Sequence, residues 1–499
     1  MPKRAILAID QGTTGSRAVV FDQDGNVLAR EYREINQIYP NPGWLEQDPM
    51  EYLHSVEECI QAVLAACGPD VAIEGIGITN QRETTVAWDR KTGKPVTNAI
   101  VWQCRRSAPY CEQLLADGVE PLIIEKTGLR IDPYFSATKI RWILDHVPEA
   151  RRLAEAGELA VGTVDTWLIW WLTGGQKHVT DVSNASRTML YNLHTGQWDP
   201  ELMELTGVPE GILPTIMESS NVFGEVAIDL GRLKGVPIAG VAGDQQAALF
   251  GQACFEPGMT KNTYGTSLAV MMSTGDRPIP SKHGLTTDMG WSIRGRKSYS
   301  LEGVVFIGGM AVQWLRDGIK VINHAAETEA LARSVEGTGG VYFVPAFVGL
   351  CAPYWDMYAR GTIVGITHGT TEAHLARATL ESIAYQTRDN VDAMAQDLGR
   401  PVPVLRVDGN ATRNEFLMQF QADILGIPVE RAANQEMAAQ GAAFLAGLCV
   451  GTWASQDELS RLWKSDRVFE PKMDEARREE LYAGWKRAVE RSLAWAQSE

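Results

Sequence analysis

Short apolar runs separated by small polar turns open the chain, a pattern typical of antiparallel β-strands. Apolar residues dominate positions 4–10 and 17–22, and a third, shorter run lies within 26–31. We therefore expect a three-stranded β-meander at the N-terminus. A further buried strand is expected at 73–79, where it leads into the polar segment 80–83.

Longer segments carry apolar residues at spacings of three and four positions, which predicts helices. Trp167, Trp170 and Trp171 are expected to be core residues of one such helix. The C-terminal helix is charged and amphipathic, and we expect it to be a solvated cap. Helices are predicted at 136–146, 166–173, 371–399, 415–425 and 474–497, and a strand is predicted at 404–407.

A Gly-Thr pair in a turn that leads into an apolar strand occurs twice, at 12–13 and at 265–266. The two copies lie about 250 residues apart, which indicates two similar domains facing each other across a cleft. We place these domains at 1–252 and 253–499. Turns of this kind present backbone N–H groups and hydroxyls together, and such groups suit phosphate oxygens.

Charge and cysteine content narrow the class of protein. The chain has 46 Lys and Arg against 62 Asp and Glu, a net charge of −16, so a nucleic-acid partner is not expected. Its seven cysteines form no C-x-x-C pair, which argues against disulfides and structural zinc and favours a reducing compartment. No apolar run is long enough to span a membrane, so we expect a cytoplasmic protein.

Several common catalytic motifs are absent. The sequence contains no G-x-x-x-x-G-K-[ST], H-E-x-x-H or G-x-S-x-G. P-loop, zinc-hydrolase and serine-hydrolase chemistry therefore have no support.

The segment 10–17 gathers groups that could handle a metal–nucleotide complex. Asp10 ends a predicted buried strand, where a carboxylate can hold Mg²⁺, and Thr13, Thr14 and Arg17 can meet phosphate oxygens. The alternative is an Asx-type turn in a hairpin.

A second carboxylate, Asp244, follows the apolar run 236–241 at the expected start of a helix. It could simply cap that helix. It could also act as the general base that takes a proton while a hydroxyl attacks a γ-phosphate.

Four further residues have the chemistry of a polyol site. Arg82 and Glu83 can bind hydroxyl groups, and Trp102 and Tyr134 can pack against a carbon chain. Taken one at a time, each is more typical of a solvated or core position than of a binding site. Their weight comes from acting as a set.

Two long stretches resemble the signatures of the FGGY carbohydrate kinases: 134–146 (YFSATKIRWILDH) and 361–381 (GTIVGITHGTTEAHLARATLE). The stretches ITNQRETT, NAIVWQCRR, AGDQQAALFGQ and KNTYGT are similar to the members that phosphorylate glycerol. The resemblance covers roughly residues 4–490.

The resemblance implies an α/β fold with two actin-like, ribonuclease-H-like ATPase domains and a cleft between them that binds ATP and Mg²⁺. The N-terminal domain would bind polyol and phosphate, and the C-terminal domain would bind the nucleotide and carry the helical cap. A homo-oligomer, dimer or tetramer, is also implied.

The same resemblance implies roles for individual residues. Asp244 would be the base and Asp10 would lie near the metal. The acceptor would be held by Arg82, Glu83, Trp102, Tyr134, Asp244 and Gln245. The nucleotide would be held by Thr13, Thr14, Arg17, Thr266, Gly309, Gln313, Gly409 and Asn414.

The chain departs from the pattern of these kinases at several positions. Gly15, Ser267 and Asn410 stand where Ser, Gly and Gly are usual, and Ala269 replaces a Phe on the wall of the polyol pocket. The Ala opens space there. At 233–235 a Gly replaces the Arg through which regulated members bind fructose 1,6-bisphosphate, so that inhibition is not expected.

Three hypotheses follow. The first is ATP-dependent phosphorylation of glycerol to sn-glycerol 3-phosphate, the entry step of glycerol catabolism. The second is a kinase of the same family acting on another small polyol or ketose, as Ala269 suggests. The third is an ATP-binding scaffold like actin or a chaperone ATPase, or a catalytically idle paralogue.

Overall fold

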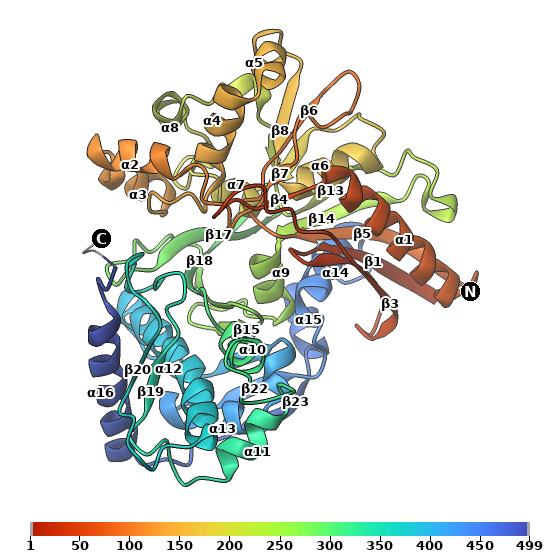
Figure 1. Cartoon of the computed structure of the whole chain (residues 1–499). Helices are drawn as coiled ribbons and strands as arrows, with labels where there is room; N and C mark the ends of the chain where they lie inside the picture. The colour runs from red at the N-terminus through yellow and green to blue at the C-terminus, as the bar shows by residue number, and fades with distance from the viewer. Residues whose placement is uncertain (1–2, 497–499) are drawn as a thin grey trace.

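The computed structural model describes residues 3–496 and is built around one mixed sheet, which has thirteen strands within that range. Helices cover both faces of the sheet (Figure 1). The strand order is β23-β22-β21-β15-β16-β18-β17-β13-β14-β5-β1-β2-β3. Of these thirteen strands, the six that come first in the chain lie together and form the N-terminal half of the sheet. The other seven form the C-terminal half.

The N-terminal half of the sheet begins with the expected meander. Its first three strands are antiparallel, whereas β5 and β14 add on in parallel and β13 closes the edge. The strands are β1 (Lys3–Gln11), β2 (Gly15–Asp22), β3 (Val27–Glu34), β5 (Val71–Asn80), β13 (Ser220–Glu225) and β14 (Pro237–Gly243).

The C-terminal half repeats this arrangement. An antiparallel group is followed by two parallel strands and an antiparallel edge. Its strands are β15 (Thr260–Tyr264), β16 (Leu268–Gly275), β17 (Thr286–Ile293), β18 (Arg296–Val305), β21 (Leu405–Asp408), β22 (Val429–Ala432) and β23 (Ser465–Phe469). The duplicated α/β architecture expected from the two Gly-Thr turns is therefore confirmed.

The main helices are α1 (Pro49–Cys67), α4 (Ser136–His146), α6 (Val164–Leu172), α7 (Val182–Ser186), α9 (Asp244–Gly251), α10 (Met310–Asp317), α12 (Glu372–Leu398), α13 (Glu415–Leu425), α14 (Met437–Val450) and α16 (Glu475–Ser492). Smaller helices are α2 (Ala108–Ala116), α3 (Glu120–Thr127), α5 (Pro148–Glu155), α8 (Pro200–Thr206), α11 (Glu327–Arg333) and α15 (Gln456–Leu462). Short strand pairs add β4 (Glu46–Gln47), β6 (Val86–Asp89), β7 (Ala99–Ile100), β8 (Leu159–Gly162), β9 (Val179–Asp181), β10 (Tyr191–Asn192), β11 (Gln197–Trp198), β12 (Thr215–Met217), β19 (Tyr342–Val344) and β20 (Thr362–Val364).

The two halves are joined in an unequal way. Within the described residues, the two halves of the sheet are paired only where β13 meets β17, through Ser220 and Ile293. Helix α14, although late in the chain, lies on the sheet of the N-terminal half (Figure 1). A Cβ on Gly77 of β5 would lie 2.2 Å from the carbonyl oxygen of Ala442, so the helix rests directly on the strand. The boundary at 252/253 stays a prediction.

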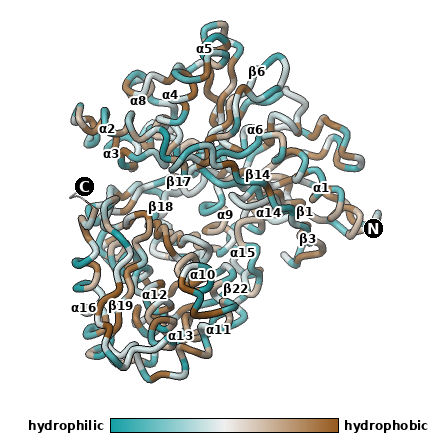
Figure 2. The backbone as a smooth tube through the Cα atoms, viewed as in Figure 1, coloured by the Kyte–Doolittle hydropathy of each residue, from teal (hydrophilic) through white to brown (hydrophobic). Residues whose placement is uncertain are grey.

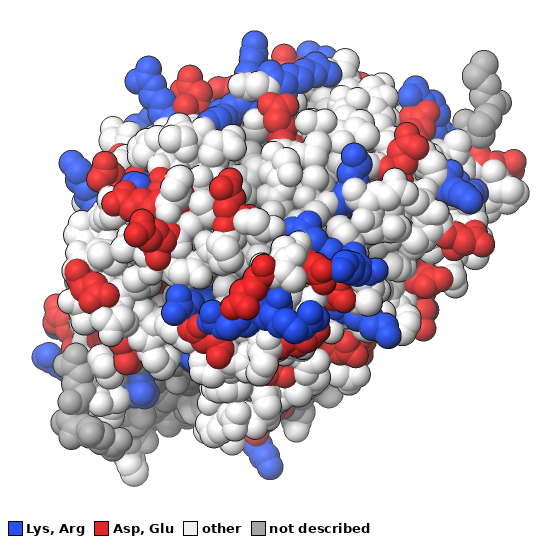
Figure 3. All heavy atoms as spheres, turned by 90° about the horizontal axis from the view of Figure 1, so that it is seen from above, with Lys and Arg blue, Asp and Glu red and all other residues white. Residues whose placement is uncertain are grey.

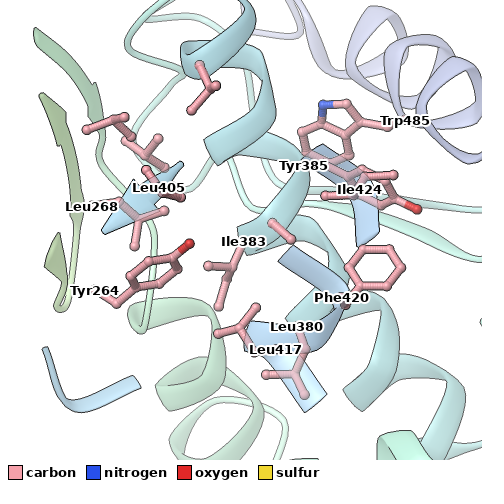
Figure 4. Packing of buried hydrophobic residues seen from close by; sticks show 14 of the residues in the cluster. Tyr264, Leu268, Leu380, Ile383, Tyr385, Leu405, Leu417, Phe420, Ile424 and Trp485 are labelled. Carbon is pink, nitrogen blue, oxygen red and sulfur yellow. The ribbon is translucent and has the colours of Figure 1, made fainter. Parts of the chain in front are cut away.

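The C-terminal helix corrects one expectation. Helix α16 is charged on its outer face, but Trp485 is fully buried, and its ring stacks on Tyr385 at 5.4 Å between centroids. Figure 4 shows both rings within the core of the C-terminal half. Buried residues at 485, 488, 489 and 492 form an apolar stripe at helical spacing. The prediction of a solvated cap is wrong for this face, and Gln497 lies outside the described residues.

Of the three expected core tryptophans, Trp167 is buried, whereas Trp170 and Trp171 are half-buried. Among residues 3–496 no helix has the length and apolar character needed to cross a membrane. Figure 2 shows polar and apolar stretches mixed along the helices. Acidic and basic side chains are interspersed on the face shown in Figure 3.

Candidate active site

A cleft of about 900 Å³ lies between the two halves, and residues from both line it. Nine of the residues singled out from the sequence contribute to its walls. These are Asp10, Arg17, Asp244, Gln245, Thr266, Gly309, Gln313, Gly409 and Asn414. Residues separated by up to 400 positions in the chain are thus brought to one crevice.

One wall is formed by the second Gly-Thr turn and the start of α10. The backbone N–H groups of Gly309 and Met310 donate to the carbonyl oxygens of Gly265 and Thr266, at 2.9 and 3.2 Å. A Cβ on Gly309 would lie 2.7 Å from the oxygen of Gly265, so only glycine fits there. These hydrogen bonds fix the start of α10 beside the turn, so the positive end of the helix dipole lies at this wall of the cleft.

The opposite end of this wall is the connection between β21 and α13. Gly409 has φ +95°, and a Cβ there would lie 2.5 Å from the carbonyl oxygen of Tyr264. The backbone can take this path because glycine lacks the side chain. Asn414 caps α13, since its Oδ1 accepts the N–H of Leu417 at 2.9 Å.

Asp10 and Arg17 lie at the floor of the cleft with an acidic partner that the sequence did not reveal. Arg17 Nη1 is 3.6 Å from Asp10 Oδ2 and 2.7 Å from Oε2 of Glu436, the residue just before α14. Burial raises the pKa of Asp10 to about 6, against the lowering effect of Arg17, and the carboxylates of Asp244 and Glu436 add to the rise.

This donor set fits Mg²⁺ carried in by a nucleotide. Among the described residues there is no group of three or more His, Cys, Asp or Glu side chains arranged to hold a metal. Mg²⁺ is commonly bound by one or two carboxylates together with substrate phosphates and water, and does not need a cage of protein ligands. Asp10 supplies such a carboxylate at the cleft floor.

The two threonines of the first Gly-Thr turn do not line the cleft in this structure. Thr13 Oγ1 accepts a hydrogen bond from Trp102 Nε1 at 2.9 Å. Thr14 is exposed, and its Oγ1 accepts from the Tyr32 hydroxyl at 3.3 Å. The first Gly-Thr turn is therefore hydrogen-bonded to Trp102, one of the residues expected to bind the acceptor.

Asp244 occupies the centre of the site. It is the first residue of α9, and Gly243 takes the cap position that was the alternative for Asp244. Its Oδ1 lies 3.3 Å from Arg82 Nε, and its side chain is 30% exposed toward the cleft. Burial raises the pKa of Asp244, while Arg82 and then Lys261 oppose that rise.

Behind Asp244, Arg82 and Glu83 belong to a buried ionic network. Glu302 Oε1 is 2.5 Å from Arg82 Nη2, and Glu302 Oε2 is 2.7 Å from Arg187 Nη1. Arg187 in turn contacts Glu83 at 2.6 Å and Asp288 at 2.7 Å. All of these side chains are at most 3% exposed. Glu302 and Asp288 come from the C-terminal half, so the network crosses between the halves.

Sequence reasoning missed Arg187, Glu302, Asp288 and Lys261. Lys261 lies inside the quoted KNTYGT stretch, and its motif could have pointed to it. Glu302 has a weaker signal, a lone carboxylate in the strand segment YSLEGVV.

Backbone strain coincides with this network. Glu83 has φ +59°, and the N–H of Thr84 donates to the carbonyl oxygen of Arg82 at 2.6 Å, which makes Glu83 the centre of a tight γ-turn. Residues held in this region cost about 1–3 kcal/mol and gather at functional sites. The hydroxyl groups of Thr85 and Ser136 donate to the Glu83 carbonyl oxygen and stabilise the turn.

The aromatic wall is braced by a buried lysine. Trp102 and Tyr134 pack edge to face with centroids 5.5 Å apart, and Arg82 Nη2 is 3.5 Å from the Tyr134 hydroxyl. Lys139 Nζ donates to the carbonyl oxygens of Pro133 and Phe135 at 2.7 and 3.1 Å and also to that of Tyr134. The loop that carries Tyr134 is therefore anchored to α4.

The strand register shows which side of the sheet carries the side chain of Ala269. Ala269 is opposite Thr263 on one side and Val304 on the other. Two residues along, Met271 is likewise flanked by Lys261 and Glu302. Since side chains alternate between faces, both rows point to the same side of the sheet. The side chain of Ala269 is therefore on the same side of the sheet as those of Lys261 and Glu302.

Comparisons with known proteins agree with this geometry. The FGGY family of carbohydrate kinases, N-terminal domain, matches residues 5–251, and its C-terminal domain matches residues 260–449. Glycerol kinase 2 of Thermotoga maritima is 59% identical over 493 residues, 98% of this chain and 99% of that protein. Glycerol kinase of Symbiobacterium thermophilum is 58% identical over 498 residues, 99% of this chain and 100% of that protein. The crystal structure of Plasmodium falciparum glycerol kinase with ADP has a TM-score of 0.92 at 38% identity and covers 98% of each chain. The chain therefore belongs to the FGGY family of carbohydrate kinases.

Proposed function

We propose that this chain transfers the γ-phosphoryl group of ATP to a hydroxyl of glycerol and forms sn-glycerol 3-phosphate. The observation that carries this proposal is the position of Asp244, which lines the same cleft as Thr266 and lies 3.3 Å from Arg82. Relatives named glycerol kinase, at 59% and 58% identity, support glycerol as the acceptor.

On the acceptor side, Arg82 and Glu83 offer opposite charges that donate to and accept from neighbouring hydroxyls. Their mutual network keeps them in place, because every charged group in it has a buried partner. Gln245 adds a third polar contact, and Trp102 and Tyr134 cover the carbon chain.

On the nucleotide side, Thr266 holds phosphate oxygens together with Arg17, Thr13 and Thr14, and the dipole of α10 adds a positive potential at this wall. The two threonines would join on closure of the cleft. Gly309, Gln313, Gly409 and Asn414 surround the nucleoside. Asp10 would lie near Mg²⁺, which would supply positive charge to neutralise the phosphates.

Asp244 then performs the proton transfer. The acceptor hydroxyl attacks the γ-phosphorus as its proton passes to the carboxylate of Asp244, and ADP leaves. Closure of the two halves excludes water, which would otherwise accept the phosphoryl group.

Asp244→Asn tests this role. We expect kcat with glycerol to fall by roughly 10²-fold or more, because the amide cannot take the proton. ADP affinity, measured by calorimetry, should stay within about threefold. Asp276→Asn, at a side chain that is 90% exposed, provides the matched control and should keep full activity. Near-normal turnover by the Asp244 variant would remove that residue from its role.

A second acceptor class is favoured by one observation. Ala269 has only a methyl group, opposite Val304 and on the side of the sheet that carries Lys261 and Glu302. We expect Ala269→Phe to raise the preference, in kcat/KM, for glycerol over erythritol, dihydroxyacetone and ribulose by about tenfold, since the larger ring shortens the pocket. A coupled ADP assay over this panel measures the preference, and an unchanged ratio would show that position 269 does not contact the acceptor.

A scaffold function is disfavoured because a nucleotide-binding scaffold has no use for the buried Arg82 and Glu83 pair beside Asp244. ADP release that none of the polyols stimulates would favour it. A dimer or tetramer and a cytoplasmic location stay predictions.

A further inference from the structure

Lys261 is a fully buried lysine that the proposed mechanism does not use, and its partners Gln245 and Thr263 line the cleft. It lies on β15 in the C-terminal half, and its ammonium group has three acceptors. Nζ donates to Thr263 Oγ1 and to the carbonyl oxygen of Ala269, each at 3.1 Å, and to Oε1 of Gln245. A lysine ammonium has three N–H groups, so each of them is engaged.

The contact with Gln245 determines how that amide is oriented. Because Oε1 accepts from an ammonium group, which can only donate, the other end of the amide must be the NH₂ group. In that orientation Nε2 donates toward Asp244 Oδ2 at 3.3 Å. The reversed amide would place two donors against each other at Lys261 and two acceptors against each other at Asp244.

The contact also spans the two halves of the molecule. Gln245 is in the first turn of α9, beside β14, whereas Lys261 is on β15 of the other half. The buried charges that face Asp244 include the cation Arg82 and the carboxylates Glu302 and Asp10. Burial lowers the pKa of Lys261 to about 8, against the opposing effect of Asp408 and Glu302, so the group is largely protonated at pH 7.

We propose that Lys261 is a positioning residue that holds the amide of Gln245 with its NH₂ group toward Asp244 and the acceptor. This inference rests on the proposed kinase function. Lys261 touches neither reacting atom, and it acts through Gln245. It also makes the acceptor site depend on the C-terminal half of the chain.

A double-mutant cycle on the full-length chain tests the proposal. Lys261→Met, Gln245→Ala and the double variant are compared with the wild type for kcat/KM with glycerol. Each single variant is expected to lose about 10- to 100-fold, in line with the cost of misplacing a substrate contact. The double variant should lose no more than Gln245→Ala does, within about threefold. KM for ATP should be unchanged in Lys261→Met, because the nucleotide does not contact the amide.

Lys282→Met, at an exposed lysine, provides the matched control and should behave as wild type. If Lys261→Met does not fold, Lys261→Gln, which keeps an N–H donor, takes its place in the cycle. Multiplicative losses in the double variant, or a KM for ATP raised in parallel, would overturn the positioning role. An inactive wild type would instead overturn the proposed function, so the two failures are distinguishable.

Discussion

Asp165 is a fully buried carboxyl group in the N-terminal half, away from the cleft. Its Oδ2 accepts a hydrogen bond from the Thr180 hydroxyl at 2.7 Å, and its Oδ1 accepts from the Thr163 hydroxyl. A second buried carboxyl group, that of Asp181, is nearby. Burial, and then the charge of Asp181, raise the pKa of Asp165 to about 7.

The pH dependence of stability follows from that value. In the unfolded chain Asp165 loses its proton near pH 4, whereas in the folded chain it keeps the proton until about pH 7. Its stabilising contribution is therefore complete at low pH and is lost as the pH rises toward 7.

Asp165→Asn removes this titration, and its amide can accept from the hydroxyl of one threonine and donate to the hydroxyl oxygen of the other. We expect the variant to gain about 2 kcal/mol relative to wild type between pH 5 and pH 8, because wild type must bury a charge at the higher pH. Urea unfolding at the two pH values measures the difference. A constant difference would show that Asp165 does not titrate in this range.

At the scale of elements, α9, which begins with the proposed base Asp244, packs against α14. Helix α9 begins with Asp244, and it crosses α14 where both helices have glycine. A Cβ on Gly441 would lie 1.8 Å from the carbonyl oxygen of Ala247, and one on Gly251 would lie 2.2 Å from that of Met437. The two backbones are therefore in direct contact, and the start of α9 is fixed by α14.

Gly441→Ala should separate these helices. We expect a loss of about 1–3 kcal/mol in the free energy of unfolding, the usual cost of overpacking. A fall in kcat/KM should accompany it, because Asp244 moves with α9. Gly211→Ala is the control, since a Cβ there meets no atom within 4 Å and the residue does not need positive φ. Unfolding in urea and the coupled assay give both readouts, and equal stability of the two variants would contradict the account.

At the scale of the whole molecule, elements were predictable and long-range pairings were not. Helices α4 and α13 begin and end where the apolar spacing predicts, and the duplicated Gly-Thr turns indicate the repeated sheet. Local patterns are enough for this, since capping and periodicity depend on neighbours in sequence. The acceptor network, in contrast, joins Arg82 to Glu302 and Arg187 to Asp288, partners about 100 to 220 positions apart, and no local pattern encodes such pairs.

Among the residues expected to bind the nucleotide, some have surroundings that the sequence predicts and others do not. Thr266 and Gly409 stand in glycine-containing turns whose chemistry is visible in the sequence. The outward position of Thr14 and the partnership of Arg17 with Glu436 depend on how α14 is placed. That placement is a property of the assembled fold.

The position of α14 on the N-terminal half has a consequence for biosynthesis. Translation produces β1, β5 and β14 long before residue 450, yet the face of these strands that α14 covers stays bare until that residue has left the ribosome. The sheet of the first half is therefore complete at Gly243 but lacks this cover until α14 ends at Val450. Its final packing therefore follows translation of about nine-tenths of the polypeptide, so this half cannot reach its final structure as an independent unit during synthesis.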